Sequence, residues 1–270
     1  MISVIIVQYN NSRLTHTAIE SFRKYHTCNY EIIVVDNGST EPNAVEFAKD
    51  IPNLKLICLD KNLGFGKANN LAVQKSLGDI LLFLNNDTVT TSEFISKIEA
   101  EFYKDSSIGI IGPKLYNPDG SLQLSYGKLP SVFVEFADKL FYALVDKKNK
   151  LVLNYLKKKY FKKEITGWVT GAALSITKKL FLELNGFDES FFMYFEDKDL
   201  CKRVNDSGKK IVFSPDSSLI HLRGASLNDP NREFLNKKYR ESQLIYYKKH
   251  KSKFEQILLK AYLRISGKTS

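Results

Sequence analysis

Short apolar runs alternate with amphipathic segments over the first 115 residues. Apolar, β-branched runs that end in polar or turn-forming residues predict strands at 3–10, 30–39, 54–60 and 79–88. An apolar period of 3.6 residues predicts helices at 12–26, with Ser12 as its N-cap, at 41–51 and at 66–78. Because these strands are apolar on both faces, they predict an α/β fold with a doubly wound sheet. The polar residues after each strand are then expected to share one edge, where such sheets bind ligands.

The pattern changes after about residue 114. Asp119 and Gly120 predict a hairpin turn, and residues 131–163 predict one or two amphipathic helices with a basic face. Beyond them, the patterns predict a strand-like stretch at 164–177, two short strands within 209–224, and helices at 178–186, 196–208 and 231–262. We therefore expect one domain over 1–230, divided near residue 115, and a helical, basic C-terminal extension over 231–270.

Basic residues cluster along the chain, whose formal net charge is +10. Residues 147–163 contain eight lysines and no acid, beside Leu, Tyr and Phe. Such segments suit either an anionic membrane surface or a solvated face. A nucleic-acid partner is disfavoured, because no helix-turn-helix, zinc-finger or aromatic RNA-binding signature accompanies the charge.

The composition predicts a soluble protein of the reducing cytoplasm. No stretch of about 18 apolar residues could span a membrane, and the first residues lack the basic region and cleavage site of a signal peptide. Cys28, Cys58 and Cys201 are widely spaced, so neither a disulfide framework nor a zinc site is indicated.

Candidate chemistry lies where the predicted strands end. Asn86 and Asp87 follow an apolar strand, where they either offer oxygen ligands to Mg²⁺ or Mn²⁺ or form an ordinary turn. Asp36 either binds a base or ribose or caps the next helix, and Lys67, beside two glycines, could meet a phosphate. His221 is either a metal ligand or a structural histidine.

A second set of candidates lies in the later strands and helices. The stretch that holds Trp168 and Gly171 either lets a backbone approach a ligand closely, through the small residues Gly171, Ala172 and Ala173, or is a packed core strand. Asp199 has the i,i+4 spacing of a surface ion pair with Arg203. Glu196 and Asp197, by contrast, are adjacent acids after an aromatic run, a setting that raises a carboxyl pKa and suits a general base.

Seven motifs in order resemble the family 2 inverting glycosyltransferases, most closely their bacterial rhamnosyltransferase-like branch. They are SVIIVQYN, VVDNGS, NLGFGKANN, LLFLNNDT, WVTGAALSIT, GFDESFFMYFEDKDLCKRV and IHLRGAS. The resemblance implies a GT-A fold, with a nucleotide-binding half at 1–115 and an acceptor and catalytic half at 116–230 that carries the insertion 131–163. It also implies a divalent metal, Mn²⁺ or Mg²⁺, and a nucleotide-diphosphate sugar.

The resemblance also implies roles for individual residues. Asp197 looks like the general base, with Glu196 orienting the acceptor, and Asp87 and His221 look like metal ligands. Asn85 and Asn86 depart from the family, because many relatives have acids there. The positions expected to bind the nucleotide sugar are Val7, Tyr9, Asp36, Lys67, Asn70, Asn86, Trp168 and Gly171.

The function implied is inverting transfer of a sugar in bacterial surface polysaccharide synthesis. The expected donor is dTDP-rhamnose, with UDP-galactose, UDP-glucose or UDP-galactofuranose as alternatives. The expected acceptor is a glycan or a lipid-linked glycan at the inner face of the cell membrane. A catalytically silent protein that binds nucleotide sugars is the other alternative, which the two asparagines keep open.

Overall fold

The computed structural model describes residues 1–27, 29–42, 44–147, 149–222 and 232–265. Its strands are β1 Ile2–Gln8, β2 Tyr30–Asp36, β3 Leu54–Cys58, β4 Ile80–Leu84, β5 Thr88–Thr90, β6 Ile108–Tyr116, β7 Leu122–Gln123, β8 Tyr126–Gly127, β9 Glu164–Thr166, β10 Trp168–Val169, β11 Ala173–Thr177 and β12 Lys210–His221. Its helices are α1 Ser12–Tyr25, the 3₁₀ helix η1 Glu46–Asp50, α2 Phe65–Val73, α3 Ile95–Lys104, α4 Val132–Asp146, α5 Lys150–Lys159, α6 Lys178–Glu183, α7 Glu196–Asp206, α8 Arg232–His250 and α9 Lys253–Ile265.

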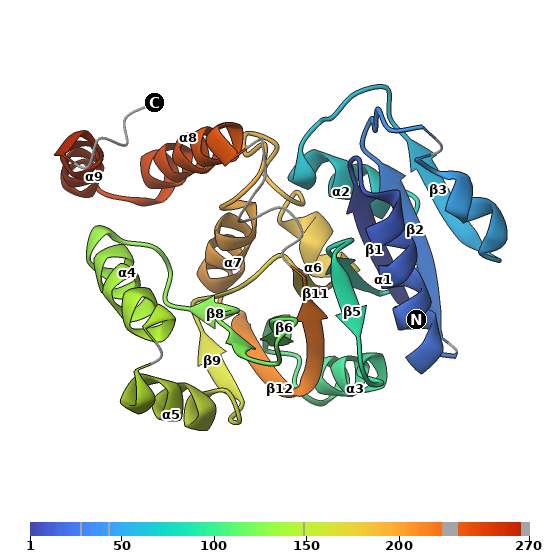
Figure 1. Ribbon diagram of the computed structural model, residues 1–270, viewed down its shortest axis with the longest axis horizontal. Helices are drawn as coiled ribbons and strands as arrows, with labels where there is room; N and C mark the ends of the chain where they lie inside the picture. The colour runs from blue at the N-terminus through green and yellow to red at the C-terminus, as the bar shows by residue number, and fades with distance from the viewer. Residues whose placement is uncertain (28, 43, 148, 223–231, 266–270) are drawn as a thin grey trace.

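One mixed sheet forms the centre of the molecule (Figure 1). Its strand order is β3-β2-β1-β4-β11-β6-β12-β5, with β7 paired to β6 and β9 paired to β12. Strands β1 to β4 run parallel, whereas β11 is antiparallel to both of its neighbours, β4 and β6. The predicted α/β fold with a doubly wound sheet is confirmed.

Alternate residues of the central strands point to two separate apolar layers. In β1, Ile2, Val4 and Ile6 pack with helices α1 and α3, whereas Ile5 faces the other layer, which contains α2, α6 and α7. The strands are apolar on both faces because helices cover both faces. The carboxyl ends of β1, β2 and β4 thus reach the same edge of a rigid core.

Several predicted elements have different limits in the structure. Helix α1 has Asn11, not Ser12, at its N-cap position, and the helix predicted at 41–51 is reduced to the 3₁₀ turn η1. Residues 209–224 were predicted to form two short strands, but one strand, β12, runs through to His221 with a bulge between Ser214 and Ser218. The bulge lets a single strand change register where the sequence has a turn-like Pro-Asp-Ser. The hairpin turn at Asp119 and Gly120 is confirmed between β6 and β7.

Helices α4, α5, α8 and α9 lie beyond the central sheet (Figure 1). The segment 131–163 contains two helices, α4 and α5, and the C-terminal extension contains two, α8 and α9. The predicted boundary at residue 230 and the last four residues of the motif IHLRGAS lie outside the described residues. The extension packs on the rest of the chain through an aromatic cluster that includes Phe191 and Phe195 before α7 and Tyr246 and Tyr247 of α8.

Candidate functional site

Asp87 and His221 lie side by side at the edge of the sheet. The Oδ1 atom of Asp87 is 3.1 Å from Nε2 of His221, and both side chains are 15% exposed. They meet because β5, which begins directly after Asp87, pairs antiparallel with the end of β12, where His221 is opposite Thr88. The two residues predicted as metal ligands are 134 positions apart in the chain, and strand pairing brings them together.

The buried side chain of Gln123 sets the orientation of the His221 ring. Its Oε1 atom lies 2.7 Å from Nδ1 of His221, and its Nε2 atom donates to Oδ1 of Asn117 at 2.9 Å. Because the amide nitrogen of Gln123 faces an acceptor, its oxygen must face the ring, and Nδ1 of His221 must carry a proton. The Nε2 lone pair of a neutral His221 then points at the Asp87 carboxylate.

Two acceptor atoms 3.1 Å apart are close enough to bind one cation together, with the ion to one side of the line that joins them. A neutral imidazole nitrogen and a carboxylate oxygen are ligands of divalent metals such as Mn²⁺. Among the described residues, no group of three or more His, Cys, Asp or Glu side chains could enclose a metal. The residues therefore fit an open site with two protein ligands, whose other positions would be left to water or to a ligand.

The carboxylate of Asp197 is held by the backbone of Gly171. The Gly171 N–H donates to Oδ2 of Asp197 at 2.9 Å, and a side chain at position 171 would begin 3.4 Å from Cβ of Asp197. The next residue, Ala172, accepts the N–H of Asn85 at 2.9 Å. Residues 171 and 172 therefore connect Asp197 to the strand end that carries Asp87.

Lys198 and two aromatic rings, one partly exposed and one buried, lie beside Asp197. The Lys198 ammonium lies 4.9 Å from the ring centre of Trp168 and 4.4 Å from that of Phe195. Trp168 is partly exposed on β10 and packs against the main core. The structure therefore places Asp197 beside Trp168 and Gly171, which lie 29 and 26 positions earlier in the chain.

Glu196 is buried beside Asp197 and contributes differently to the site. Its side chain is 7% exposed, and its Oε2 atom has no hydrogen-bond partner within the described part of the chain. Burial, together with the neighbouring Asp197 carboxylate, raises the pKa of Glu196 to about 8. The adjacent acids thus differ in their surroundings, since one is buried without a partner and the other accepts a backbone N–H.

The backbone before these acids is strained. Tyr194 and Phe195 both have left-handed φ angles, 67° and 66°, which bulky residues rarely adopt. The loop they end is fixed from both sides: Phe192 O accepts the N–H of Phe65, and Met193 O accepts the Ser242 hydroxyl. Strain held in place by surrounding contacts is typical of functional loops.

Asp36 lies at the end of β2, opposite the end of β1. Its carboxylate accepts the side-chain amide of Gln8 at 3.0 Å and the hydroxyl of Ser39. Gln8 is fully buried and was not among the residues predicted from the sequence. Parallel pairing of β1 and β2 places it opposite Asp36, which is the signal that could have identified it. The predicted base-reading residue is thus oriented by Gln8 at the end of β1 and by Ser39 in the loop after β2.

The other residues predicted to bind the nucleotide sugar have varied surroundings. At the end of β1, Val7 is partly buried, and Tyr9 is 44% exposed just beyond it. Asn86 donates to the Thr15 hydroxyl at 3.2 Å. Lys67 and Asn70, both on α2, contact the loop that follows α6.

These contacts connect α2 to that loop. Lys67 Nζ is 3.0 Å from Glu189 Oε2, and both side chains are nearly half exposed. The Asn70 amide accepts from Phe187 N at 2.9 Å and donates to Phe187 O at 2.8 Å. A nucleotide contact by Asn70 would have to share an amide that already holds this loop.

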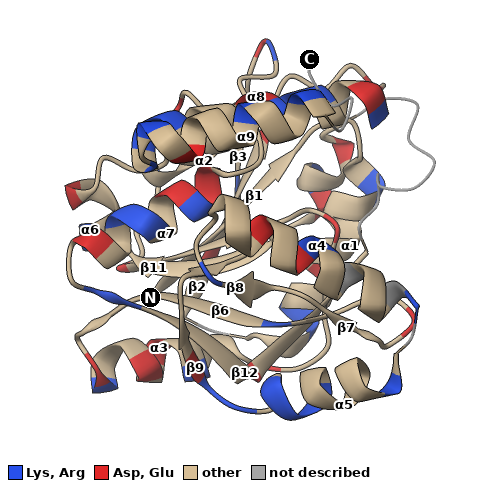
Figure 2. Ribbon diagram, turned by 90° about the vertical axis from the view of Figure 1, so that its left-hand side faces the viewer, with Lys and Arg blue, Asp and Glu red and all other residues tan. Residues whose placement is uncertain are grey.

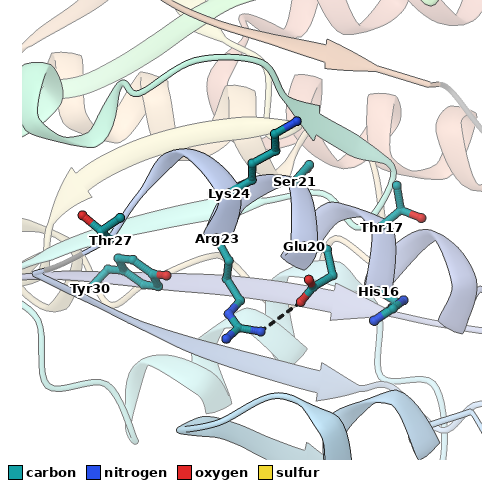
Figure 3. Close-up of a pocket in the computed structure, with 8 residues that line it drawn as sticks. All are labelled: His16, Thr17, Glu20, Ser21, Arg23, Lys24, Thr27 and Tyr30. Atoms are coloured by element: carbon teal, nitrogen blue, oxygen red, sulfur yellow. Dashed lines mark hydrogen bonds and ion pairs between the residues drawn. The ribbon is translucent and has the colours of Figure 1, made fainter.

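A surface depression on the outer side of α1 contains none of the predicted site residues. It is lined by residues from α1, from the turn after it and from the start of β2, and Figure 3 shows the Arg23–Glu20 ion pair at 2.9 Å among them. The candidate site therefore rests on the strand ends and on α7.

Comparison with protein families agrees with the motifs. The model of Glycosyl transferase family 2 matches residues 3–173, which is more than half of the chain. The chain belongs to this family. A second model, the N-terminal domain of galactosyltransferase, matches residues 149–223.

Relatives of this family 2 glycosyltransferase include several rhamnosyltransferases. Rhamnosyltransferase WbbL of Escherichia coli is 26% identical, over 89% of this chain and 89% of the relative. The N-acetylglucosaminyl-diphospho-decaprenol L-rhamnosyltransferase of Mycobacterium tuberculosis is also 26% identical, over 72% of this chain and 67% of the relative. The dTDP-rhamnosyl transferase RfbF of Shigella flexneri is 25% identical, over 83% of this chain and 69% of the relative. The predicted likeness to the rhamnosyltransferase-like branch is confirmed.

Solved glycosyltransferase structures share the fold. GalNAc-T7, crystallised with UDP, GalNAc and Mn²⁺, matches with a TM-score of 0.63 at 16% identity over 92% of this chain, which spans 50% of the GalNAc-T7 chain. Staphylococcus aureus TarS in complex with UDP matches with a TM-score of 0.57 at 18% identity, over 92% of this chain and 72% of TarS. The predicted GT-A fold is confirmed.

Proposed function

We propose that this protein transfers a sugar, with inversion, from a nucleotide-diphosphate sugar to a glycan or lipid-linked acceptor of a bacterial surface polysaccharide. The observation that carries the proposal is the junction at Gly171 and Ala172. It connects the carboxylate of Asp197 to the strand end that holds the Asp87 and His221 pair, in a chain whose family transfers sugars.

Inversion needs a single displacement at the anomeric carbon. Asp197 takes the proton of the acceptor hydroxyl as that oxygen attacks the anomeric carbon, and the bond from this carbon to the nucleoside diphosphate breaks, so the diphosphate leaves with the electron pair. The hydrogen bond from Gly171 N–H keeps the Asp197 carboxylate oriented without protonating it. Glu196, buried directly before it, helps to orient the acceptor. No side chain has to form a bond to the sugar.

The other site residues bind and orient the donor. Asp36, held by Gln8, contacts the base, with Val7 and Tyr9 at the same strand end, while Asn86 lies near the ribose or diphosphate. Lys67, Asn70, Trp168 and Gly171 complete the proposed contact set. A divalent metal, Mn²⁺ or Mg²⁺, held by Asp87 and His221 would neutralise charge on the diphosphate.

The expected donor is dTDP-rhamnose. The similarity to the dTDP-rhamnosyl transferase RfbF and to two other rhamnosyltransferases supports it. A UDP-hexose is the second candidate, because residues 149–223 match a galactosyltransferase model. A catalytically silent role is disfavoured, since Asp87 and His221 remain paired although asparagines occupy positions 85 and 86.

Replacing the proposed base tests the reaction. Asp197→Asn should lower the turnover number by a factor on the order of 10²–10⁴, the usual contribution of a general base, while nucleotide binding is retained. Transfer would be measured with dTDP-rhamnose and with each UDP-hexose, which also identifies the donor. Asp206→Asn is the matched control, because it lies on the same helix and pairs with Lys202 at the surface.

Two results would contradict the proposal. One is near-normal turnover in Asp197→Asn. The other is retention of the donor's anomeric configuration in the product, which NMR coupling constants would reveal, because a single displacement must invert that centre.

A further inference from the structure

Helix α4 exposes a row of large apolar side chains. Phe133, Phe136 and Leu140 are 74%, 68% and 60% exposed, and their i, i+3, i+7 spacing places them on one face of the helix. The sequence pattern predicted a basic face for this segment. The exposed face of α4 is largely apolar, and most exposed lysines on the two helices of this segment lie on α5, at Lys150, Lys157 and Lys158.

Helix α9 exposes a second row with the same spacing. Phe254 and Ile257 are 66% and 65% exposed, and Ala261 continues the row. Three exposed basic side chains flank it, namely Lys253, Lys260 and Arg264. The sequence SKFEQILLKAYLRI therefore combines an apolar stripe with positive charge on the outer face of one helix.

The two helices are neighbours in the fold. Lys139 Nζ of α4 donates to the Tyr262 hydroxyl of α9 at 3.1 Å, and it lies 5.7 Å from the centre of that ring. Figure 2 looks onto the side of the molecule that carries α4, α5 and α9, where Lys and Arg lie on α5 and α9. Roughly half of the large apolar side chains exposed on the described residues lie between 133 and 161 or between 254 and 265. The two apolar rows thus lie on neighbouring helices, and lysines and arginines of α5 and α9 lie on the same side of the molecule.

We propose that the outer rows of α4 and α9 dock on the surface of an anionic lipid bilayer. Apolar side chains on an interfacial helix enter the boundary between headgroups and acyl chains, while flanking basic residues contact anionic headgroups. Each basic residue near such a surface strengthens binding about fivefold. The chain offers both features together, whereas docking two copies through these faces would bring the flanking Lys and Arg of α9 together.

The inner sides of the same helices belong to the core next to the site. Val132 at the start of α4 and Leu259 and Leu263 of α9 pack in one cluster with Phe191 and Phe195. Phe195 directly precedes Glu196 and Asp197. Docking through α4 and α9 therefore holds Asp197 at a set height above the lipid surface, whichever acceptor it serves.

Vesicle sedimentation tests the docking surface. The wild-type chain should sediment with vesicles that contain phosphatidylglycerol, should bind phosphatidylcholine vesicles far less, and should be released by salt. The pair Phe133→Ser and Phe136→Ser, and separately the pair Phe254→Ser and Ile257→Ser, should each weaken binding by on the order of tenfold or more.

The control pair is Leu77→Ser with Tyr103→Ser. These side chains are 69% and 74% exposed, as the row residues are, but they lie outside α4 and α9. Their loss should leave vesicle binding unchanged. All variants should keep wild-type circular dichroism and wild-type turnover with a water-soluble acceptor, so a failure of docking is distinguishable from a failure of the proposed reaction.

Three results would overturn the proposal. The row variants could bind anionic vesicles as tightly as the wild type, or the control pair could lose as much binding as they do. Light scattering could also show a wild-type dimer that the row variants dissociate, in which case a second copy covers these faces.

Discussion

Gln123 decides which nitrogen of His221 faces Asp87. The amide nitrogen of Gln123 donates to the Asn117 side chain and to the backbone carbonyl of His221. The amide oxygen therefore faces the imidazole ring and accepts from its Nδ1 atom. Metal-binding histidines commonly depend on such a partner, which fixes the tautomer and the ring orientation. A residue outside the predicted set therefore positions one of the predicted ligands.

Replacing Gln123 tests this role apart from catalysis. Gln123→Met keeps the length of the side chain but removes the acceptor, so Mn²⁺ affinity should fall by about 10–100-fold. The measurement is electron paramagnetic resonance of free Mn²⁺ in a titration with nucleoside diphosphate present. Gln74→Met, at an exposed position after α2, is the control and should bind Mn²⁺ like the wild type. Equal affinity in both variants would rule out the positioning role.

Glu196 should make stability depend on pH. The pKa of Glu196 is raised in the folded protein, so its protonated carboxyl group stabilises the fold fully below the pKa that it has in the unfolded chain. This stabilisation is lost as the pH rises through the folded pKa of about 8. Glu196→Gln removes this dependence. Between pH 6 and pH 9, its free energy of unfolding in urea should therefore rise relative to the wild type.

Glu93 is a matched control for this measurement. Desolvation raises the pKa of Glu93, but hydrogen bonds from Ser96 outweigh it, so the pKa is lowered. Glu93 is therefore ionised in both the folded and the unfolded protein at pH 6 and above, and its contribution to stability is constant there. Glu93→Gln should thus differ from the wild type by the same amount at pH 6 and at pH 9. A flat difference for Glu196→Gln as well would show that Glu196 does not titrate in this range.

Helix α7 is fixed to α8 by a buried carboxylate. Asp199 is 1% exposed, and it accepts from Arg203 NH2 at 2.7 Å and lies 2.7 Å from His250 Nε2. The Arg203 guanidinium also donates to the carbonyls of Leu184 and Gly186. The i,i+4 pair predicted from the sequence is present, but it is buried rather than at the surface, because α8 covers it.

Removing the carboxylate should destabilise the protein strongly. Asp199→Ala leaves Arg203 without its charge partner in a largely buried position, so the free energy of unfolding should fall by about 3–5 kcal/mol in urea. Asp206→Ala, on the same helix, removes an exposed pair with Lys202 and should cost less than about 1 kcal/mol. Similar losses in the two variants would mean that the buried cluster does not tie α7 to α8.

The C-terminal extension shares a core with the site. Ser242 donates to the backbone of Met193, and Tyr247 donates to Glu135 of α4, so α8 contacts both the strained loop before Asp197 and the segment 131–163. The two regions that the sequence left without a clear role thus meet around the start of α7. Among the described residues, no helix is long and apolar enough to cross a membrane.

The sequence alone determined the parts of the protein that depend on local order. Apolar runs and helical periods predicted the β-α alternation of the first half, since each element needs apolar faces that its neighbours can cover. Seven ordered motifs predicted the family and the GT-A fold. Asp87, Asp197 and His221 were predicted because strand ends and a family motif mark them individually.

The tertiary structure decided what depends on contacts between distant segments. Pairing of β5 with β12 placed His221 against Asp87, and an edge strand, β7, supplied Gln123 to orient the ring. Burial of Asp199 required α8, about 50 residues later. The sequence could not reveal which face of α4 remains exposed either, because its periodicity predicts two faces and only the packing of α4 against the core assigns one of them to solvent.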